Sequence, residues 1–186
     1  MSDSVEFSAP NRLSITSLII FWLLWVFATA ATTAASRALV TAIQNLVPGD
    51  NLPLDVFAIG LCVGFVQWLI LRRYLPVSGW WAPATSLWEV AELAIFAFRV
   101  PGAFLGGALV GAVQWLVLRR VVDGAEVWIG VTAVGWSVAA FLASTFLSRL
   151  NTGYTASYTV FHALIAVITG IGLVWIMRMA SDSGIG

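Results

Sequence analysis

The chain reads GALVGAVQWLVLRR at residues 107–120 and GLCVGFVQWLILRR at residues 60–73. The two segments share two glycines four residues apart, a Gln-Trp pair and a terminal Arg pair, always at an offset of 47 residues. The match continues beyond each segment, where Trp81 pairs with Trp128 and Thr85 with Thr132. So many identities at one offset indicate an internal repeat.

A weaker third copy ends the chain. Ala166 and Gly170 precede Arg178 at the spacing found in the second copy, and Leu173 stands in the place of the glutamine. Each copy pairs one apolar segment with a Gly-rich segment that returns across the membrane, so three copies predict three helical hairpins. Equivalent helices run in the same direction in every copy, which makes the repeats parallel, with an axis along the membrane normal.

The amino-acid composition indicates that lipid, and not water, surrounds most of this chain. Of its 186 residues, 60% are hydrophobic and 10% are charged, whereas a soluble domain carries about 25% charged residues. So few charges cannot cover a water-facing surface, and lipid is the solvent that fits. The nine basic residues are all arginine and are balanced by nine acidic ones, so the chain has no basic patch for nucleic acid.

Six apolar segments approach the ~20 residues that a helix needs to span a bilayer. We therefore predict an all-α polytopic membrane protein with six transmembrane helices arranged as three parallel-repeat hairpins. The predicted helices lie near 15–36, 54–72, 82–99, 102–120, 127–147 and 157–177. The hairpins are then about 15–72, 82–120 and 127–177, within one bundle at 15–178 that lies between tails at 1–14 and 179–186.

The first predicted helix has two features of a signal peptide, an apolar run and the cleavage-like Ala28-Thr29-Ala30. Residues 1–12, however, hold one arginine and two acids where a signal peptide needs a basic start. We therefore expect a retained helix. The loop after it, at about 37–54, is predicted to carry a small interfacial helix with Leu39, Ile43, Leu46 and Val47 on one face.

Arginine placement predicts the orientation. With the N-terminus inside, six arginines fall on the inner side and three on the outer side, as the positive-inside rule requires. Both termini are then cytoplasmic, and we expect the inner membrane of a bacterial cell. The inner set is Arg12, Arg72, Arg73, Arg119, Arg120 and Arg178, and the outer set is Arg37, Arg99 and Arg149.

The repeated positions have mechanical roles in a lipid-embedded bundle. Small residues four apart let helix backbones approach closely, and each glutamine can hydrogen-bond to a neighbouring helix. We expect the second, fourth and sixth helices to pack centrally on these residues, while tryptophan and arginine mark the inner boundary. The packing set is Gly60, Gly64, Gly107, Gly111, Gly170, Gln67 and Gln114. The boundary set is Trp68, Trp80, Trp81, Trp115, Trp128, Trp175, Arg72, Arg73, Arg119 and Arg120.

This repeat, two glycines followed by Gln-Trp and an Arg pair, resembles one found in multi-pass bacterial membrane proteins, those of phototrophic bacteria in particular. The resemblance covers most of residues 54–147 and weakens after them. It implies the fold and transfers no active site.

Glu89, Glu92 and His162 are ionisable residues that lie inside predicted spans, away from the span ends. Glu89 and Glu92 share one helix face, at a depth where a charge costs at least about 2.5–3.5 kcal/mol. They suggest a proton or cation site, protonated acids that bond to a neighbouring helix, or a site at the lipid boundary that another protein covers. His162 is the only histidine. It could ligate a haem or pigment, but the usual paired ligation needs a second histidine, so a packing role is favoured and no particular cofactor is predicted.

The sequence has no phosphate-loop, HExxH, CxxC or nucleophile-elbow motif, and we expect no enzyme. The leading hypothesis is an integral membrane scaffold or accessory subunit that organises a larger membrane complex through helix packing. Its partners would be lipid and other membrane subunits, or further copies of itself. Two alternatives stay open: a small proton- or cation-coupled transporter or channel that uses Glu92 and Glu89, and a pigment-, haem- or quinone-binding protein.

Overall fold

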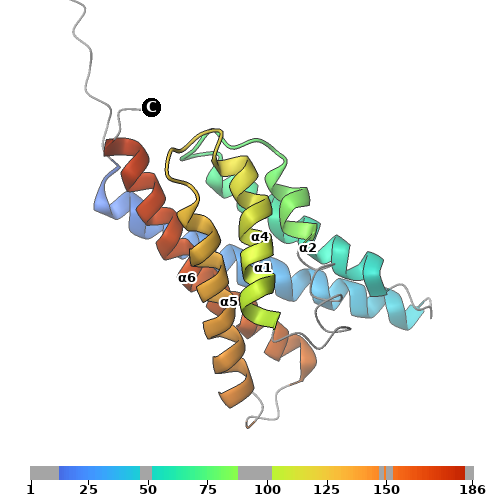
Figure 1. Cartoon of the computed structure of the whole chain (residues 1–186). Coiled ribbons are helices and arrows are strands. Elements are labelled where there is room, and N and C mark those ends of the chain that lie inside the picture. The colour runs from blue at the N-terminus through green and yellow to red at the C-terminus, as the bar shows by residue number, and fades with distance from the viewer. Residues whose placement is uncertain (1–12, 47–51, 88–101, 147–148, 150–152, 183–186) are drawn as a thin grey trace, which may run out of the picture.

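The structure is a computed structural model that describes residues 13–46, 52–87, 102–146, 149 and 153–182. These residues form helices and short turns, with no strand among them (Figure 1). The helices are α1 (Ile15–Leu46), α2 (Leu52–Leu71), α4 (Gly102–Leu118), α5 (Val127–Phe146) and α6 (Tyr154–Asp182), and residues 81–87 are also helical.

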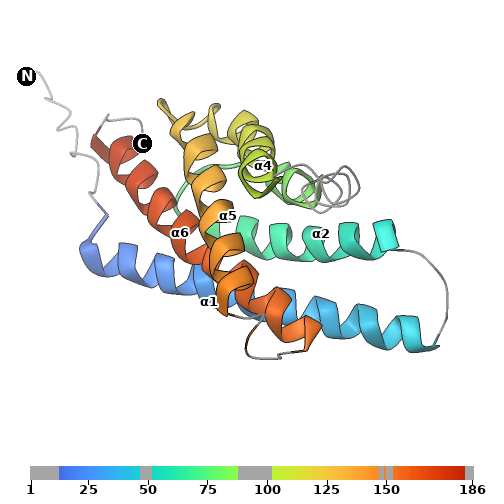
Figure 2. The same cartoon turned by 60° about the horizontal axis from the view of Figure 1, so that its bottom comes forward.

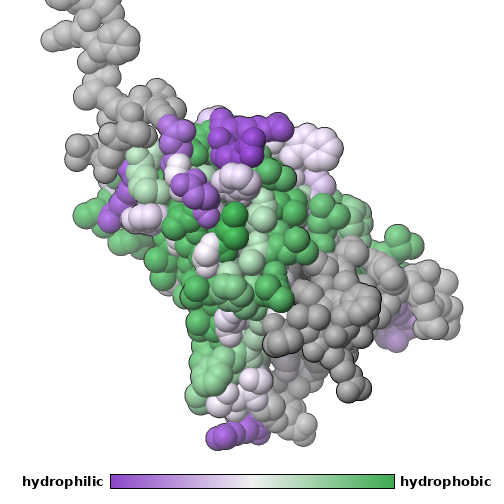
Figure 3. Space-filling view, in the orientation of Figure 1, coloured by the Kyte–Doolittle hydropathy of each residue, from purple (hydrophilic) through white to green (hydrophobic). Residues whose placement is uncertain are grey.

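Four stretches of helix are long and apolar enough to cross a membrane: Ile15–Leu46, Leu54–Leu71, Val127–Phe146 and Thr155–Ala180. Helix α4 is equally apolar, but its 17 residues place it at the lower limit of spanning length. Apolar side chains dominate the surface over these helices, and hydrophilic ones gather at the upper end (Figure 3). The prediction of an all-α chain with several helices long and apolar enough to span a membrane is confirmed for the described residues. The predicted span 82–99 lies mostly outside the described residues.

Helix α1 is longer than predicted. It runs unbroken for 32 residues, or about 48 Å, whereas the hydrocarbon core of a bilayer is about 30 Å thick. The interfacial helix predicted within 37–54 is therefore wrong, since residues 37–46 continue α1. The reason is local, because neither glycine nor proline interrupts the chain between Ile15 and Leu46.

The helices form a closed ring of contacts. Helix α1 packs on α2 and α6, and α5 packs on α4 and α6; Figure 2 shows α1 beside α2 and α5 beside α6. Residues 81–87 lie between α2 and α4, since Trp81 bonds to Gln67 of α2 and Gln114 of α4 bonds to Thr85. The order around the ring is α1, α2, 81–87, α4, α5 and α6.

The predicted central packing of the second, fourth and sixth helices is wrong for the described residues. Each of these helices turns at least one glycine toward the next helical segment in the ring: Gly64 of α2, Gly107 and Gly111 of α4, and Gly170 of α6. A Cβ built on Gly64 would lie 2.7 Å from the Ala82 carbonyl oxygen, and one on Gly107 would lie 2.7 Å from that of Thr132. The absence of side chains on these faces lets neighbouring backbones touch and leaves the ring centre to polar side chains.

The core also takes in two tryptophans that were predicted at the membrane boundary. Trp81 and Trp128 are 0% and 1% exposed and lie in the main apolar cluster with Phe21, Leu118 and Ile176. By contrast, Trp80 and Trp175 are exposed. Because Trp81 and Trp128 each begin a helix that packs on a glycine face, their rings turn inward.

Candidate functional site

Two glutamines at equivalent positions join the helices on either side of them. The Gln114 amide nitrogen donates to the Thr85 hydroxyl at 3.0 Å, and its oxygen accepts from the Trp128 indole N–H at 2.9 Å. Gln114 is 5% exposed. Since lipid offers no competing partner for such groups, each buried bond stabilises one helix pair by about 0.6–1.7 kcal/mol.

The same geometry recurs one repeat earlier. Gln67 donates to the Thr29 hydroxyl at 3.1 Å and accepts from the Trp81 indole N–H at 3.3 Å. Each glutamine therefore donates to the preceding helix and accepts from the following one. The threonine hydroxyls of residues 85 and 132 also donate to the backbone carbonyls of Trp81 and Trp128, one turn earlier, at 2.9 and 2.7 Å.

Helix α6 makes the equivalent bond in another way. Leu173, at the position of the glutamine, cannot accept a hydrogen bond. The indole N–H of Trp25 donates instead to the Thr169 hydroxyl at 3.2 Å, one helical turn before Leu173. This bond connects the last helix, α6, to the first helix, α1.

We call these side chains the polar belt. It runs from α6 through α1, α2, residues 81–87 and α4 to α5. Leu173 is buried in the main apolar cluster at the position that a glutamine occupies in the other two copies. The members of the belt are Trp25, Thr29, Gln67, Trp81, Thr85, Gln114, Trp128 and Thr169.

The belt tryptophans also contact one another. The ring centroids of Trp25 and Trp81 are 6.2 Å apart, and those of Trp81 and Trp128 are 5.9 Å apart, in edge-on and tilted arrangements. Such pairs add about 0.5–1.5 kcal/mol beyond the area they bury. The three indoles thus link α1, residues 81–87 and α5 through the centre of the ring.

A small cavity lies beside the belt, lined by side chains from every helical segment of the ring. Its volume is about 50 Å³, which is room for a few water molecules. Its lining is neutral at the belt, with amides, hydroxyls and indole rings. The polar lining residues are Thr29, Gln67, Thr85, Gln114, Thr132, His162 and Thr169.

His162 lines this cavity and is 6% exposed. Its Nδ1 lies 2.9 Å from the Tyr158 carbonyl oxygen, and its ring packs against those of Tyr158, Phe161 and Trp136. The cavity is far below the ~300–1,000 Å³ of pockets that hold drug-sized ligands. His162 therefore occupies an aromatic packing position in this conformation.

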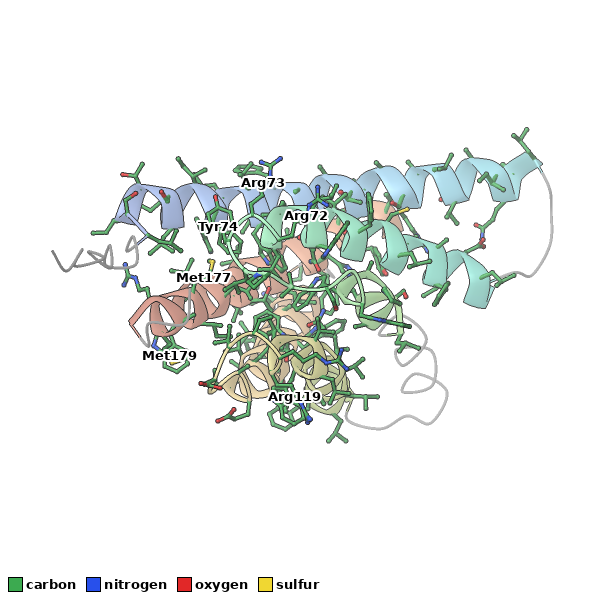
Figure 4. All side chains as sticks on the ribbon, turned by 90° about the horizontal axis from the view of Figure 1, so that it is seen from above. Arg72, Arg73, Tyr74, Arg119, Met177 and Met179 are labelled. Atoms are coloured by element: carbon green, nitrogen blue, oxygen red, sulfur yellow. The ribbon has the colours of Figure 1, made fainter. Side chains whose placement is uncertain are left out.

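Figure 4 labels three of the predicted boundary residues, Arg72, Arg73 and Arg119, which directly follow the ends of α2 and α4. The Arg72 guanidinium is 4.7 Å from the Trp68 ring centroid, and Arg119 is 5.0 Å from that of Trp115. These distances fit cation–π contacts. The Trp68 indole N–H also donates to the Val77 carbonyl at 3.1 Å, which ties down the turn after α2. The second arginines of the pairs, Arg73 and Arg120, are exposed, and Gly60 is buried in α2.

The acids Glu89 and Glu92 lie outside the described residues. Within the described part of the chain, no group of three His, Cys, Asp or Glu side chains is placed to hold a metal ion.

The threonines of the belt were not among the predicted site residues. A sequence signal for them exists, because Trp-x-x-x-Thr occurs at residues 25–29, 81–85 and 128–132. Four-residue spacing puts both side chains on one helix face, so the tryptophan and threonine point to the same side of the ring. Comparisons of the chain with family models, curated proteins and solved structures found no match.

Proposed function

We propose that this chain is a non-enzymatic scaffold or accessory subunit of a larger membrane complex. One observation carries the proposal: polar side chains at the ring centre bond to one another and join each helical segment to at least one neighbour, from α6 through α1, α2, residues 81–87 and α4 to α5. Polar groups used in this way stabilise one arrangement of helices. A rigid ring is suited to holding other membrane helices in place.

The outward faces supply the surface for such contacts. Large apolar side chains point away from the ring on several helices, among them Phe27 of α1, Phe104 of α4 and Phe141 of α5, which are 69%, 55% and 66% exposed. In lipid, helices associate by packing and occasional hydrogen bonds. These faces can therefore take either lipid chains or the helices of another subunit.

The finer architecture belongs to the same proposal. Six spans in three parallel hairpins are supported by the recurrence of the glutamine and threonine bonds at an offset of 47 residues. The start of α1 and the end of α6 lie at one end of the molecule (Figures 1 and 2), as an even number of spans requires. We place both termini in the cytoplasm of a bacterial cell on the distribution of arginine.

Photo-crosslinking in native membranes tests the scaffold role. A benzophenone side chain placed at Phe27, Phe104 or Phe141 is expected to capture a membrane polypeptide from at least one of the three positions. The same probe at Phe21 is the matched control, because Phe21 lies on α1 at 0% exposure. Mild-detergent purification should then recover the captured partner at fixed stoichiometry.

A second candidate is a small proton- or cation-coupled transporter, favoured by the central cavity and its polar lining from every helical segment. In that case the chain is recovered alone, no exposed position crosslinks, and proteoliposomes show flux that Glu92→Gln abolishes. This set of results would refute the scaffold role.

A further inference from the structure

A groove runs along the surface where α1 meets α6, away from the central cavity. On its α1 side the lining residues are three or four positions apart, so they lie on one face of the helix. Its α6 side has the same spacing. The groove is lined by Ile15, Leu18, Ile19 and Trp22 of α1, and by Ile171, Val174 and Arg178 of α6.

The floor of the groove is fixed and its walls are open to the bilayer. Leu18 is buried at 3% exposure, and the Trp22 indole N–H donates to the Val167 carbonyl at 3.0 Å, which holds its ring in place. Ile15, Ile19 and Ile171 are 68%, 53% and 58% exposed. An apolar chain lying here would therefore contact rigid aromatic and aliphatic surface on three sides.

Among the described residues that line this groove, the charged side chain is that of Arg178, at one end. Arg178 lies on the last turns of α6, and Ile15 begins α1 at the same end of the molecule (Figure 1). From Trp22 to Ile15 the groove runs for about 10 Å along α1. The groove is thus apolar along its length and ends at the exposed guanidinium of Arg178. A phospholipid has the same arrangement, with an apolar acyl chain that ends at a charged headgroup.

We propose that this groove binds one anionic phospholipid, with an acyl chain along Ile19 and Ile171 and the headgroup phosphate on Arg178. A guanidinium has five N–H donors and suits paired bonds to phosphate oxygens, with donors left for other contacts. Basic pockets between transmembrane helices are a known setting for anionic headgroups. The lipid would bridge α1 and α6, the same pair that Trp25 and Thr169 join.

The shape of the groove favours a lipid chain over a partner helix. Helices α1 and α6 touch directly beneath it, since a Cβ on Gly170 would lie 2.8 Å from Trp22 Cδ1. The groove is therefore shallow, with a volume of about 170 Å³. An α-helix is about 10–12 Å across and would rest on the isoleucines without reaching the floor.

Native mass spectrometry of the full chain tests this site. Protein equilibrated with equal amounts of phosphatidylglycerol and phosphatidylcholine is expected to retain one phosphatidylglycerol in about fivefold preference, the ratio expected for one arginine near an anionic headgroup. Arg178→Gln should abolish that preference. Arg120→Gln is the matched control, because Arg120 is also exposed at a helix end but does not line the groove.

A second variant separates the groove from simple surface charge. Ile171→Trp fills the groove and keeps Arg178, so it should also lose the retained lipid while the melting temperature stays near that of the wild type. Equal retention of both lipids by the wild-type chain, or an unchanged preference in Arg178→Gln, would overturn the proposal. So would a polypeptide crosslinked to a probe at Ile19, because the groove would then hold a partner helix.

Discussion

Replacing Gln114 with leucine is expected to lower the free energy of unfolding by about 1–3 kcal/mol, the cost of leaving a buried donor unpaired. The change removes both inter-helix bonds of this residue, to Thr85 and from Trp128. The Trp128 indole N–H, on a ring that is 1% exposed, then has no acceptor from α4. Equilibrium unfolding in mild detergent measures the loss.

The third repeat supplies a specific rescue for that variant. Val110 occupies in α4 the position that Thr169 occupies in α6, four residues before Gln114 and Leu173 respectively. The double variant Val110→Thr with Gln114→Leu gives α4 the same two residue types that α6 has at these positions. The new hydroxyl should then accept a hydrogen bond from the Trp128 indole N–H, as the Thr169 hydroxyl accepts one from Trp25. We expect it to recover about half of the lost stability, whereas Val110→Thr alone should bring no gain. A double variant no more stable than Gln114→Leu would show that the two solutions are not equivalent.

Replacing Gly111 with alanine is expected to destabilise the α4–α5 pair by about 1–3 kcal/mol, as overpacking does. The added Cβ would overlap the Thr132 side chain and lie 2.9 Å from the Ile129 Cα. A backbone atom cannot rotate away, so the helices must separate. The change in thermal unfolding temperature in detergent is the readout.

Gly130 provides the matched control for that change. It lies in α5, on the same helix pair, but a Cβ there meets nothing within 4 Å. Gly130→Ala should therefore raise stability by up to about 1 kcal/mol through helix propensity alone. If Gly111→Ala and Gly130→Ala changed the stability in the same direction, the close approach of α4 and α5 would be refuted.

The apolar helices could be predicted from the sequence because the bilayer requires their length and composition directly. The length of α1 could not be predicted in the same way, since residues 37–46 include the polar Arg37 and Gln44, which favour a loop outside the membrane. Helix α1 continues there because its backbone bonds are internal and nothing interrupts them. Arg37 adds a contact in this stretch, because its guanidinium lies 5.3 Å from the Tyr158 ring centroid.

The glutamines were predicted to bond across helices, but their partners could not be chosen from one sequence. Trp81 and Trp128 sit beside polar turns, a position that also suits a ring at the headgroups. Which role they take depends on the glycine face of the neighbouring helix, and this is a tertiary property. The Trp25–Thr169 bond was harder still, because it joins residues 144 positions apart in copies that have diverged.

The central claim of this account is that the Trp25–Thr169 bond joins the first and last helices of the ring. A double-mutant cycle with Trp25→Phe and Thr169→Val tests it directly, since each change removes one partner and keeps the shape of the side chain. We predict a coupling energy of about 0.6–1.7 kcal/mol in equilibrium unfolding, the range of inter-helix hydrogen bonds in membranes. A coupling energy of zero would contradict a ring in which α6 and α1 are joined through the polar belt.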